Sequence, residues 1–203
     1  MSSSLEDVRA EALACTKCRL SAGRTQVVFA DGSPGADLMF VGEGPGYHED
    51  VQGLPFVGAA GQLLNRLLGE IGLSREDVYI TNVVLCRPPG NRDPLPDELE
   101  SCRPYLLRQI ELVDPKVIVT LGNFATRVIL DRPVSISRVR GTKSSFHGRL
   151  VIPTFHPAAV LRSGGDASAP MRAIREDLRV VREALDEARV TAPAVPEEQL
   201  GLF

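Results

Sequence analysis

The sequence lacks several features that would assign it to a class of protein at once. No apolar run approaches the roughly 20 residues that a membrane-spanning helix needs, so we predict a soluble protein with no membrane contact. The amino terminus, MSSSLEDVRAEALAC, has no apolar core of the export-signal kind, which favours a cytoplasmic location. No internal repeat is present. The net charge of −3 argues against binding of nucleic acid through bulk positive charge.

The composition nevertheless supports a sizeable folded core. The chain has 203 residues, of which 43% are hydrophobic, and this length is typical of one domain. The last stretch, 191–203, is rich in proline, alanine and glutamate, which indicates a flexible tail. We therefore predict a single domain over 1–190 followed by that tail.

Cysteine is scarce, and its four copies carry the strongest chemical signal. Cys15 and Cys18 form a C-x2-C pair, whereas Cys86 and Cys102 form a much wider pair in a polar, proline-rich segment. Four thiolates with none left over predict one shared metal centre. Two disulfides and four unrelated buried cysteines are the alternatives, and a reducing cytosol disfavours the disulfides.

The spacing of the cysteines bears on which metal they hold. Compact zinc sites usually combine two short C-x2-C pairs, and here the second pair is wide. An iron–sulfur cluster accepts irregular spacing because its corners are spread over a larger volume. We predict a 4Fe–4S cluster held by all four cysteines, with zinc as the alternative.

Apolar patterns predict strands that alternate with helices. Short apolar runs indicate strands at 36–41, 78–85, 117–121 and 150–155, and helical periodicity or spacing indicates helices at 5–14, 61–73, 99–112, 123–130 and 171–189. This alternation is typical of an α/β three-layer sandwich with a mainly parallel central sheet. Ligands of such sheets bind beyond the carboxyl ends of the strands.

Several polar or glycine-rich features lie near those strand ends. GEGPG at 42–46 is neither a dinucleotide fingerprint nor a P-loop, and it is either a tight turn or a close approach to a ligand, with Glu43 in the cleft. Phe56, in a predicted loop, is either a core plug or a stacking platform. Asn82 either fastens a loop or reads a donor–acceptor edge. His156, one of three histidines, is the one at a predicted strand end.

The motifs GEGPG, GLPFVGAAGQLL, TNVVLCRPPGNRDP and HPAAVLR together resemble the family 4 uracil-DNA glycosylases, the 4Fe–4S branch of their superfamily. The resemblance covers about 5–162. It implies a four-stranded parallel sheet, a cluster loop, and excision of uracil from DNA by a monomeric enzyme. Its uracil pocket maps onto Gly42, Glu43, Gly44, Phe56, Asn82 and His156.

The chemistry of base excision gives each of these residues an expected role. His156 would donate a hydrogen bond to uracil O2, where negative charge develops. Glu43, with Glu49 as second candidate, would position the water and favour the positive sugar. Phe56 would stack on the flipped base, and Asn82 would read N3–H and O4.

Other residues are expected to contact DNA around the flipped base. Leu161 could wedge into the vacated stack, and Arg162 could hold a phosphate. The cluster loop could present Arg87, Arg92 or Arg103 to the backbone. The basic segment 131–149 is either a polyanion-binding face or a solvated loop.

The sequence departs from related patterns at two positions. Gly44 stands where family 1 uracil glycosylases carry a water-activating aspartate, so the water must be handled differently. Tyr47 follows GEGPG where relatives often carry an acid. We predict that Tyr47 lines the pocket near uracil C5 and excludes the methyl group of thymine.

The carboxyl-terminal QLGLF resembles the Q-L-x-L-F peptide that binds the bacterial β sliding clamp. Gln199 and the apolar anchors Leu200, Leu202 and Phe203 would make that contact. Two rival functions remain for the whole chain: a relative that stays covalently attached to abasic DNA, and a non-catalytic, metal-stapled DNA-binding or redox-sensing module.

Overall fold

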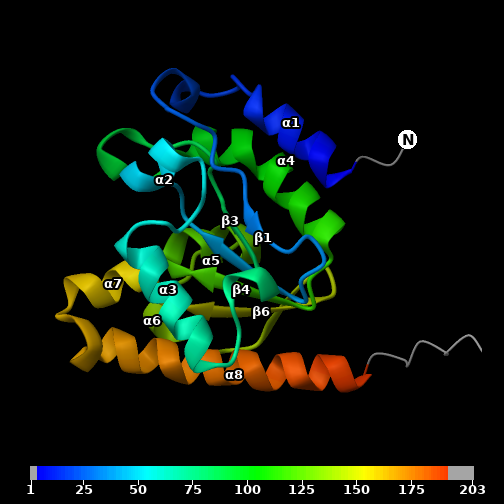
Figure 1. Cartoon of the computed structure of the whole chain (residues 1–203), viewed down its shortest axis with the longest axis vertical. Helices are drawn as coiled ribbons and strands as arrows, with labels where there is room; N and C mark the ends of the chain where they lie inside the picture. Colours follow the sequence, from blue (N-terminus) through cyan, green and yellow to red (C-terminus); the bar gives the residue numbers. More distant parts are fainter. Residues whose placement is uncertain (1–3, 192–203) are drawn as a thin grey trace, which may run out of the picture.

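The computed structural model describes residues 4–191 of the chain (Figure 1). The strands of its sheet are β1 (Asp31–Gly32), β2 (Leu38–Gly42), β3 (Tyr79–Asn82), β4 (Val117–Leu121), β5 (Ser144–Phe146) and β6 (Arg149–Thr154). The helices are α1 (Leu5–Leu13), α2 (Tyr47–Gln52), α3 (Ala59–Glu70), α4 (Pro96–Val113), α5 (Gly122–Leu130), α6 (Ile136–Val139), α7 (Pro157–Arg162) and α8 (Ala169–Thr191). Short 3-10 turns η1 (Arg19–Ala22), η2 (Arg75–Asp77), η3 (Pro89–Asn91) and η4 (Gly165–Ala167) connect them. The predicted tail lies almost wholly outside the described residues.

The sheet has six strands in the order β1-β3-β2-β4-β6-β5. Its four middle strands run parallel, whereas β1 and β5 are antiparallel to their neighbours at the two edges. The expected sheet had four strands, and the structure has two more, β1 and β5, at the edges. Both extra strands are very short, and their sequences, DG and SSF, carry no apolar run that would announce a strand.

Helices cover both faces of the sheet and make three layers. Successive side chains of a strand point to opposite faces, so Leu38 and Phe40 join one core while Met39 and Val41 join the other. Helices α3, α7 and α8 pack on the first face, and α4 and α5 pack on the second, with α1 beside α4 (Figure 1). Burial on both faces explains why the parallel strands are mostly apolar.

The order of crossovers fixes where a ligand can bind. The chain leaves β2 through α3 on one face, and it leaves β4 through α5 on the other. Because β2 and β4 are neighbours, their connections part at this point and open a crevice beyond the strand ends.

Most helices begin close to their predicted positions. Helix α1 has a capping box, in which the Ser4 hydroxyl accepts from the Asp7 amide and the Asp7 carboxylate accepts from the Ser4 amide. Helix α4 begins one turn before the predicted start, because Pro96 suits the first helical position. No helix between residues 4 and 191 has both the length and the apolarity that crossing a membrane would require.

Candidate active site

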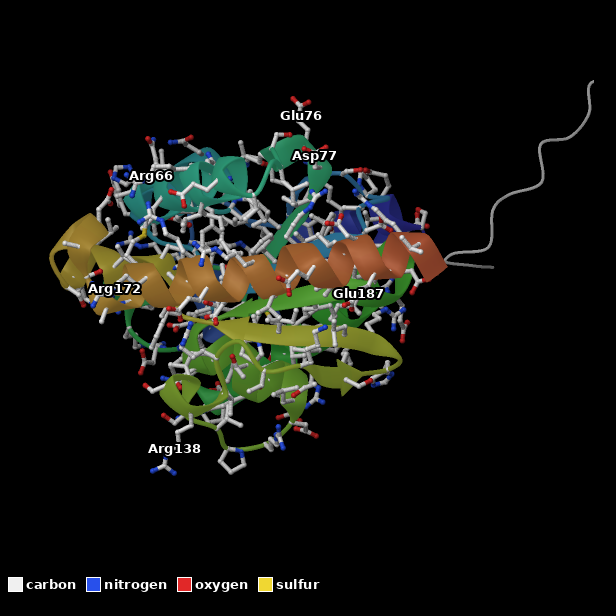
Figure 2. All side chains as sticks on the ribbon, turned by 90° about the horizontal axis from the view of Figure 1, so that it is seen from below. Arg66, Glu76, Asp77, Arg138, Arg172 and Glu187 are labelled. Carbon is white, nitrogen blue, oxygen red and sulfur yellow. The ribbon has the colours of Figure 1, made fainter. Side chains whose placement is uncertain are left out.

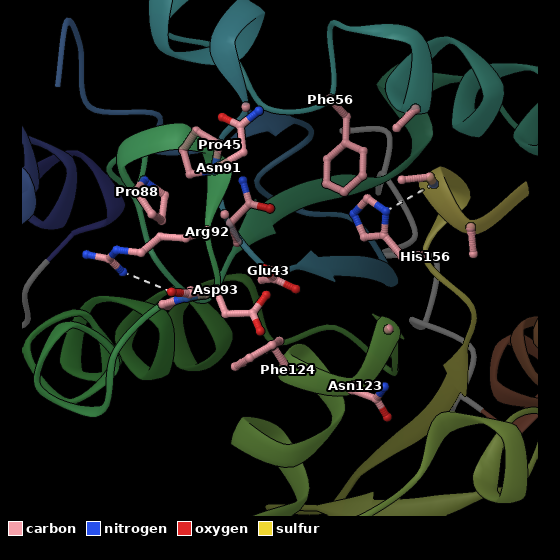
Figure 3. A pocket seen from close by; sticks show the side chains of 18 of the residues that line it. Glu43, Pro45, Phe56, Pro88, Asn91, Arg92, Asp93, Asn123, Phe124 and His156 are labelled. Atoms are coloured by element: carbon pink, nitrogen blue, oxygen red, sulfur yellow. Dashed lines mark hydrogen bonds between the residues drawn. The ribbon is translucent and has the colours of Figure 1, made fainter. Parts of the chain in front are cut away.

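A cavity of about 630 Å³ opens at the carboxyl ends of the parallel strands (Figure 3). Of the predicted residues, those that line it are Glu43, Gly44, Glu49, Phe56, Asn82, Arg92, His156 and Arg162. Gly42 lies behind this lining, beside Asn82 and Phe56. The structure thus brings residues from the carboxyl ends of β2, β3 and β6, and from the segments that follow them, to one cavity at the crevice between β2 and β4.

Phe56 is held in a backbone conformation that few residues adopt. Its φ is +54°, in the left-handed region that normally favours glycine. The Arg75 guanidinium donates to the Phe56 carbonyl at 3.1 Å and also to the carbonyl of Pro55, while its Nε pairs with Asp31. On the other side, a side chain at Gly61 would collide with the Phe56 carbonyl. Arg75 therefore fixes the loop that aims the Phe56 ring.

The Phe56 ring stacks against the His156 ring in the wall of the cavity. The two ring centroids lie 5.5 Å apart, with an angle of 28° between the ring planes (Figure 3). Aromatic rings at this separation are in stacking range, and a flat ligand would share the same wall.

We expect substitution of Arg75 by methionine to lower kcat/KM for a uracil-releasing reaction about tenfold, mainly through a higher KM. The reason is that two carbonyls lose a charged donor, and each such hydrogen bond contributes about 1.5–3 kcal/mol. Steady-state kinetics and inhibition by free uracil would measure the effect. Arg66→Met is the matched control, because Arg66 of α3 makes a surface pair with Asp166 (Figure 2). An unchanged KM and unchanged uracil inhibition in folded Arg75→Met would contradict the role of Arg75.

Asn82 presents a buried acceptor to the cavity. The residue is 2% exposed, and its Oδ1 has no hydrogen-bond partner among the described residues. A buried acceptor without a partner costs about 1–3 kcal/mol, so a donor on a ligand would be favoured here. Gly42 lets Asn82 and Phe56 approach, since a Cβ on Gly42 would lie 2.6 Å from the Phe56 ring and closer still to Asn82 Oδ1.

His156 caps helix α7 and points its other nitrogen away from the helix. Its Nδ1 accepts from the Ala158 amide at 3.1 Å, so the proton of the neutral ring resides on Nε2 (Figure 3). Burial, together with the nearby positive charge of Arg162, lowers the pKa of His156 to about 4, against a smaller opposing effect of Glu49. His156 is therefore a neutral N–H donor at physiological pH.

Glu43 follows β2 and lines the cavity as a carboxyl group with an unusual pKa. Burial, together with the negative charge of Asp93, raises this pKa from 4.5 to about 7, whereas the charge of Arg162 opposes the rise. A carboxyl group with this pKa exchanges protons readily near neutral pH, as a general base requires. The next residue, Gly44, has no room for a side chain, because a Cβ there would lie 2.6 Å from the Val84 side chain.

Glu49 has one carboxylate oxygen committed to the backbone. Its Oε1 accepts from the amides of Val57 at 3.0 Å and Gly58 at 2.8 Å. These contacts tie α2 to the loop that carries Phe56 and to the start of α3. Glu49 thus has a positioning role for the Phe56 loop, while its part in handling water stays a prediction.

Tyr47 does not lie where the sequence placed it. It is 56% exposed, and it is not among the residues that line the cavity. Helix α2 begins at Tyr47 and turns the side chain outward, where it meets His48 edge-on and Arg87 through a cation–π contact. The prediction that Tyr47 lines the uracil pocket is therefore wrong.

The predicted DNA-contacting residues differ in how free they are. Leu161 is 47% exposed, and neighbouring Arg162 lines the cavity. Arg92 also lines the cavity, but it donates two hydrogen bonds to buried Glu98, at 2.6 and 2.9 Å, and Arg103 pairs with Asp131 at 3.5 Å.

Three of the five basic residues in the segment 131–149 form ion pairs within the protein. Arg140 pairs with Asp177 and Glu176, Lys143 with Glu187, and Arg149 with Asp114. These pairs favour a structural role for the segment over a broad polyanion-binding face.

The four cysteines gather beside α1 and α4. Cys86 and Cys102 are buried, and Cys15 and Cys18 pack against the same apolar cluster. Burial raises the pKa of both buried thiols, and the charges of Cys15 and Cys18 raise it further. All four thiols therefore lie within electrostatic range of one another.

Arg24 bridges the two halves of this cysteine group. Its Nη1 donates to the Cys15 carbonyl at 2.7 Å and to Cys86 Sγ at 3.3 Å. Sequence reasoning missed both Arg24 and Arg75, because a lone arginine in a polar loop carries no pattern. Asp93 and Phe124, which also line the cavity, gave no signal either.

Comparison with known proteins agrees with this geometry. Residues 29–179 match the model of the Uracil DNA glycosylase superfamily. The type-4 uracil-DNA glycosylase of Sulfurisphaera tokodaii is 46% identical over 89% of this chain and 84% of that protein. Its counterparts from Archaeoglobus fulgidus (50% identical; 78% of this chain, 83% of the relative) and Thermotoga maritima (48%; 86% and 88%) are similarly close. The chain therefore belongs to the type-4 branch of the uracil-DNA glycosylase superfamily.

Proposed function

We propose that this chain excises uracil from DNA by hydrolysing the bond between deoxyribose C1′ and uracil N1, which leaves an abasic site for base excision repair. The observation that carries the proposal is the buried, unpartnered Oδ1 of Asn82 in the wall of the cavity. The N3–H group of uracil is a donor that would satisfy it.

The same acceptor explains rejection of cytosine. Neutral cytosine has a lone pair on N3 and an amino group at C4, so its edge reverses the pattern of uracil. Oδ1 of Asn82 would then face another acceptor and remain unpaired, at a cost of about 1–3 kcal/mol. Phe56 recovers part of the cost of unstacking by stacking on the flipped base.

His156 and Glu43 divide the chemistry between them. As the C1′–N1 bond breaks, its electron pair leaves with uracil, and the Nε2–H of His156 stabilises the charge on O2. A water molecule adds to the positive C1′ and transfers a proton to Glu43. That proton returns through solvent to the uracil anion, so sugar hydroxyl and neutral uracil are the products.

A uracil-release assay tests the proposal. The purified, metal-loaded protein would be incubated with a labelled single-stranded oligonucleotide that carries one uracil, and products would be resolved with and without hot alkali. Alkali-dependent cleavage at the uracil is expected. A heat-stable shifted band would indicate the covalent binder, and unchanged DNA would indicate the non-catalytic module.

The donor set of the cysteine group fits a 4Fe–4S cluster. The support for it is that the chain has four cysteines, that all four pack on one apolar cluster, and that a cluster of this kind takes four thiolates. Within residues 4–191, no group of His, Cys, Asp or Glu side chains is arranged to hold a metal ion, so the number of thiols and their gathering carry this part of the proposal. When bound, the cluster would link the amino-terminal segment, through Cys15 and Cys18, to the loop before α4 and to α4 itself, through Cys86 and Cys102.

Replacement of Arg24 by methionine is expected to weaken cluster retention about 10- to 100-fold, as loss of groups that support metal ligands typically does. The donor to Cys86 and to the Cys15 backbone would be absent. Iron content after challenge with a chelator, and the decay of the visible cluster absorption in air, would report the change. Arg19→Met is the control, since Arg19 forms a surface pair with Asp97. Equal iron loss in both variants would refute the role of Arg24, and zinc in place of iron in the wild type would refute the cluster.

The clamp-binding peptide lies outside the described residues and remains part of the proposal. Deletion of 199–203 should abolish binding to the β sliding clamp and leave uracil release from free oligonucleotides unchanged, because the catalytic residues lie in the folded domain. Surface plasmon resonance on immobilised clamp would measure the loss. Substitution of Glu197 and Glu198 by alanine is the control, since it keeps the QLGLF peptide. Undiminished clamp affinity after the deletion would disprove the assignment.

A further inference from the structure

We propose that Tyr47 and Arg87 form a second nucleotide subsite at the rim of the cavity. In this subsite the base next to the uracil, in the same DNA strand, stacks on the Tyr47–Arg87 pair, and the Arg87 guanidinium contacts its phosphate. The proposal rests on the proposed function, because it places the flipped uracil in the adjacent cavity.

Tyr47 has the exposure and the support that a stacking platform needs. The ring is 56% exposed, although its position directly follows Gly46, which lines the cavity. The His48 ring holds it edge-on at a centroid distance of 5.4 Å, and the Arg87 guanidinium carbon lies 5.2 Å from its centroid. An aromatic ring that is fixed by its neighbours yet open to solvent can accept a base at little cost in ordering.

Arg87 is anchored to the cavity wall rather than to a carboxylate. Its Nε donates to Asn91 Oδ1 at 2.8 Å, and Asn91 itself lines the cavity. Among residues 4–191, no carboxylate lies within ion-pair distance of Arg87, in contrast to Arg92 in the same loop. The positive charge of Arg87 is therefore oriented by its neighbours and remains available to a phosphate.

The rim has a similar arrangement on its opposite side. Asn91 and Pro88 lie on the side of the cavity away from His156 (Figure 3), and His156 begins the helix that carries Leu161 and Arg162. One side of the opening thus has Tyr47 and Arg87, and the other has Leu161 and Arg162. Among the described residues, neither arginine has a carboxylate within ion-pair distance. This arrangement matches a strand that enters on one side of the flipped nucleotide and leaves on the other.

Charge and continuity favour a nucleotide over a protein as the occupant. The apolar strip continues along α2 to Val51 and beyond it to Leu54, both exposed, but Arg87 lies at the end nearest the cavity. A flanking nucleotide supplies both an aromatic face and a negative charge at that end, so it satisfies the ring and the guanidinium together.

Oligonucleotides with a missing neighbour base test the subsite. Three single-stranded substrates would carry uracil with normal neighbours, with a base-free spacer immediately 5′, or with the spacer immediately 3′. For the wild type, the spacer that removes the base held by the subsite should lower kcat/KM about tenfold. This factor lies within the roughly 5- to 150-fold range of base–aromatic stacking. Tyr47→Ala should lose a similar factor on the normal substrate and no longer respond to that spacer, whereas Tyr47→Phe should behave as the wild type.

Salt dependence gives a second, independent readout. Arg87→Gln should reduce the slope of log binding affinity against log salt by about one unit, the expected effect of one lost phosphate contact. Arg179→Gln is the control, since Arg179 is an exposed arginine of α8 outside the cavity. An active wild type whose response to both spacers is unchanged by Tyr47→Ala would overturn the subsite alone. A wild type that releases no uracil would overturn the proposed function and the subsite together.

Discussion

Replacement of His156 by alanine is expected to lower kcat for uracil release about 100- to 1,000-fold, which is the usual effect of removing one donor to a developing oxyanion. The imidazole is oriented by the hydrogen bond that Nδ1 accepts from the Ala158 amide, so its Nε2–H is the group that would face uracil O2. Single-turnover kinetics would isolate the chemical step. His156→Gln keeps a side-chain N–H donor and should recover part of the rate.

The pKa of about 4 makes this prediction specific to a neutral donor. Because burial keeps the ring uncharged well above that pKa, activity should show no fall between about pH 5 and pH 8 that depends on His156. A decline centred near the ordinary histidine pKa, absent from His156→Gln, would mean that the imidazolium is the active form.

Glu43 gives the second large effect, which depends on pH. Burial raises its pKa to about 7, so the carboxylate that accepts a proton from water predominates only above that pH. Wild-type kcat/KM should therefore rise with pH and level off above about pH 7, and Glu43→Gln should lose about 100- to 10,000-fold and show no such rise. A pH profile of single-stranded uracil release would measure both.

Asp93 provides a control for the origin of that profile. Its charge contributes to the raised pKa of Glu43, so Asp93→Asn should move the rising limb to lower pH while the plateau stays the same. A flat wild-type profile, together with full activity in Glu43→Gln, would remove the role of base from Glu43.

The middle of the sheet could be predicted because buried parallel strands are apolar throughout. The prediction of 117–121 matches β4, and those for β2 and β6 differ by a residue or two. The edge strands could not be found, since two or three residues of Asp, Gly, Ser and Phe have no periodicity. Their pairing depends on neighbours far along the chain.

The positions of Glu43, Asn82 and His156 followed from the rule that ligands bind at strand ends. The raised pKa of Glu43 could not be predicted in this way, because it depends on burial and on the charge of Asp93, which lies 50 residues away in sequence. The backbone of Phe56 was also beyond reach, as its conformation depends on Arg75. Tyr47 was wrongly placed in the pocket because it directly follows the GEGPG motif. Being next to a motif in sequence does not fix the direction in which a side chain points.

The pocket beside β2 and β4 is assembled from distant parts of the chain, and this affects how activity returns during refolding. Its walls come from connections spread between Glu43 and Arg162, so no fragment that contains one hairpin or one strand–helix–strand unit can form it. Such long-range closure is slow relative to helix formation. After dilution from denaturant, uracil release should therefore lag behind the recovery of helical circular dichroism, and catalysis would report completion of the whole sheet.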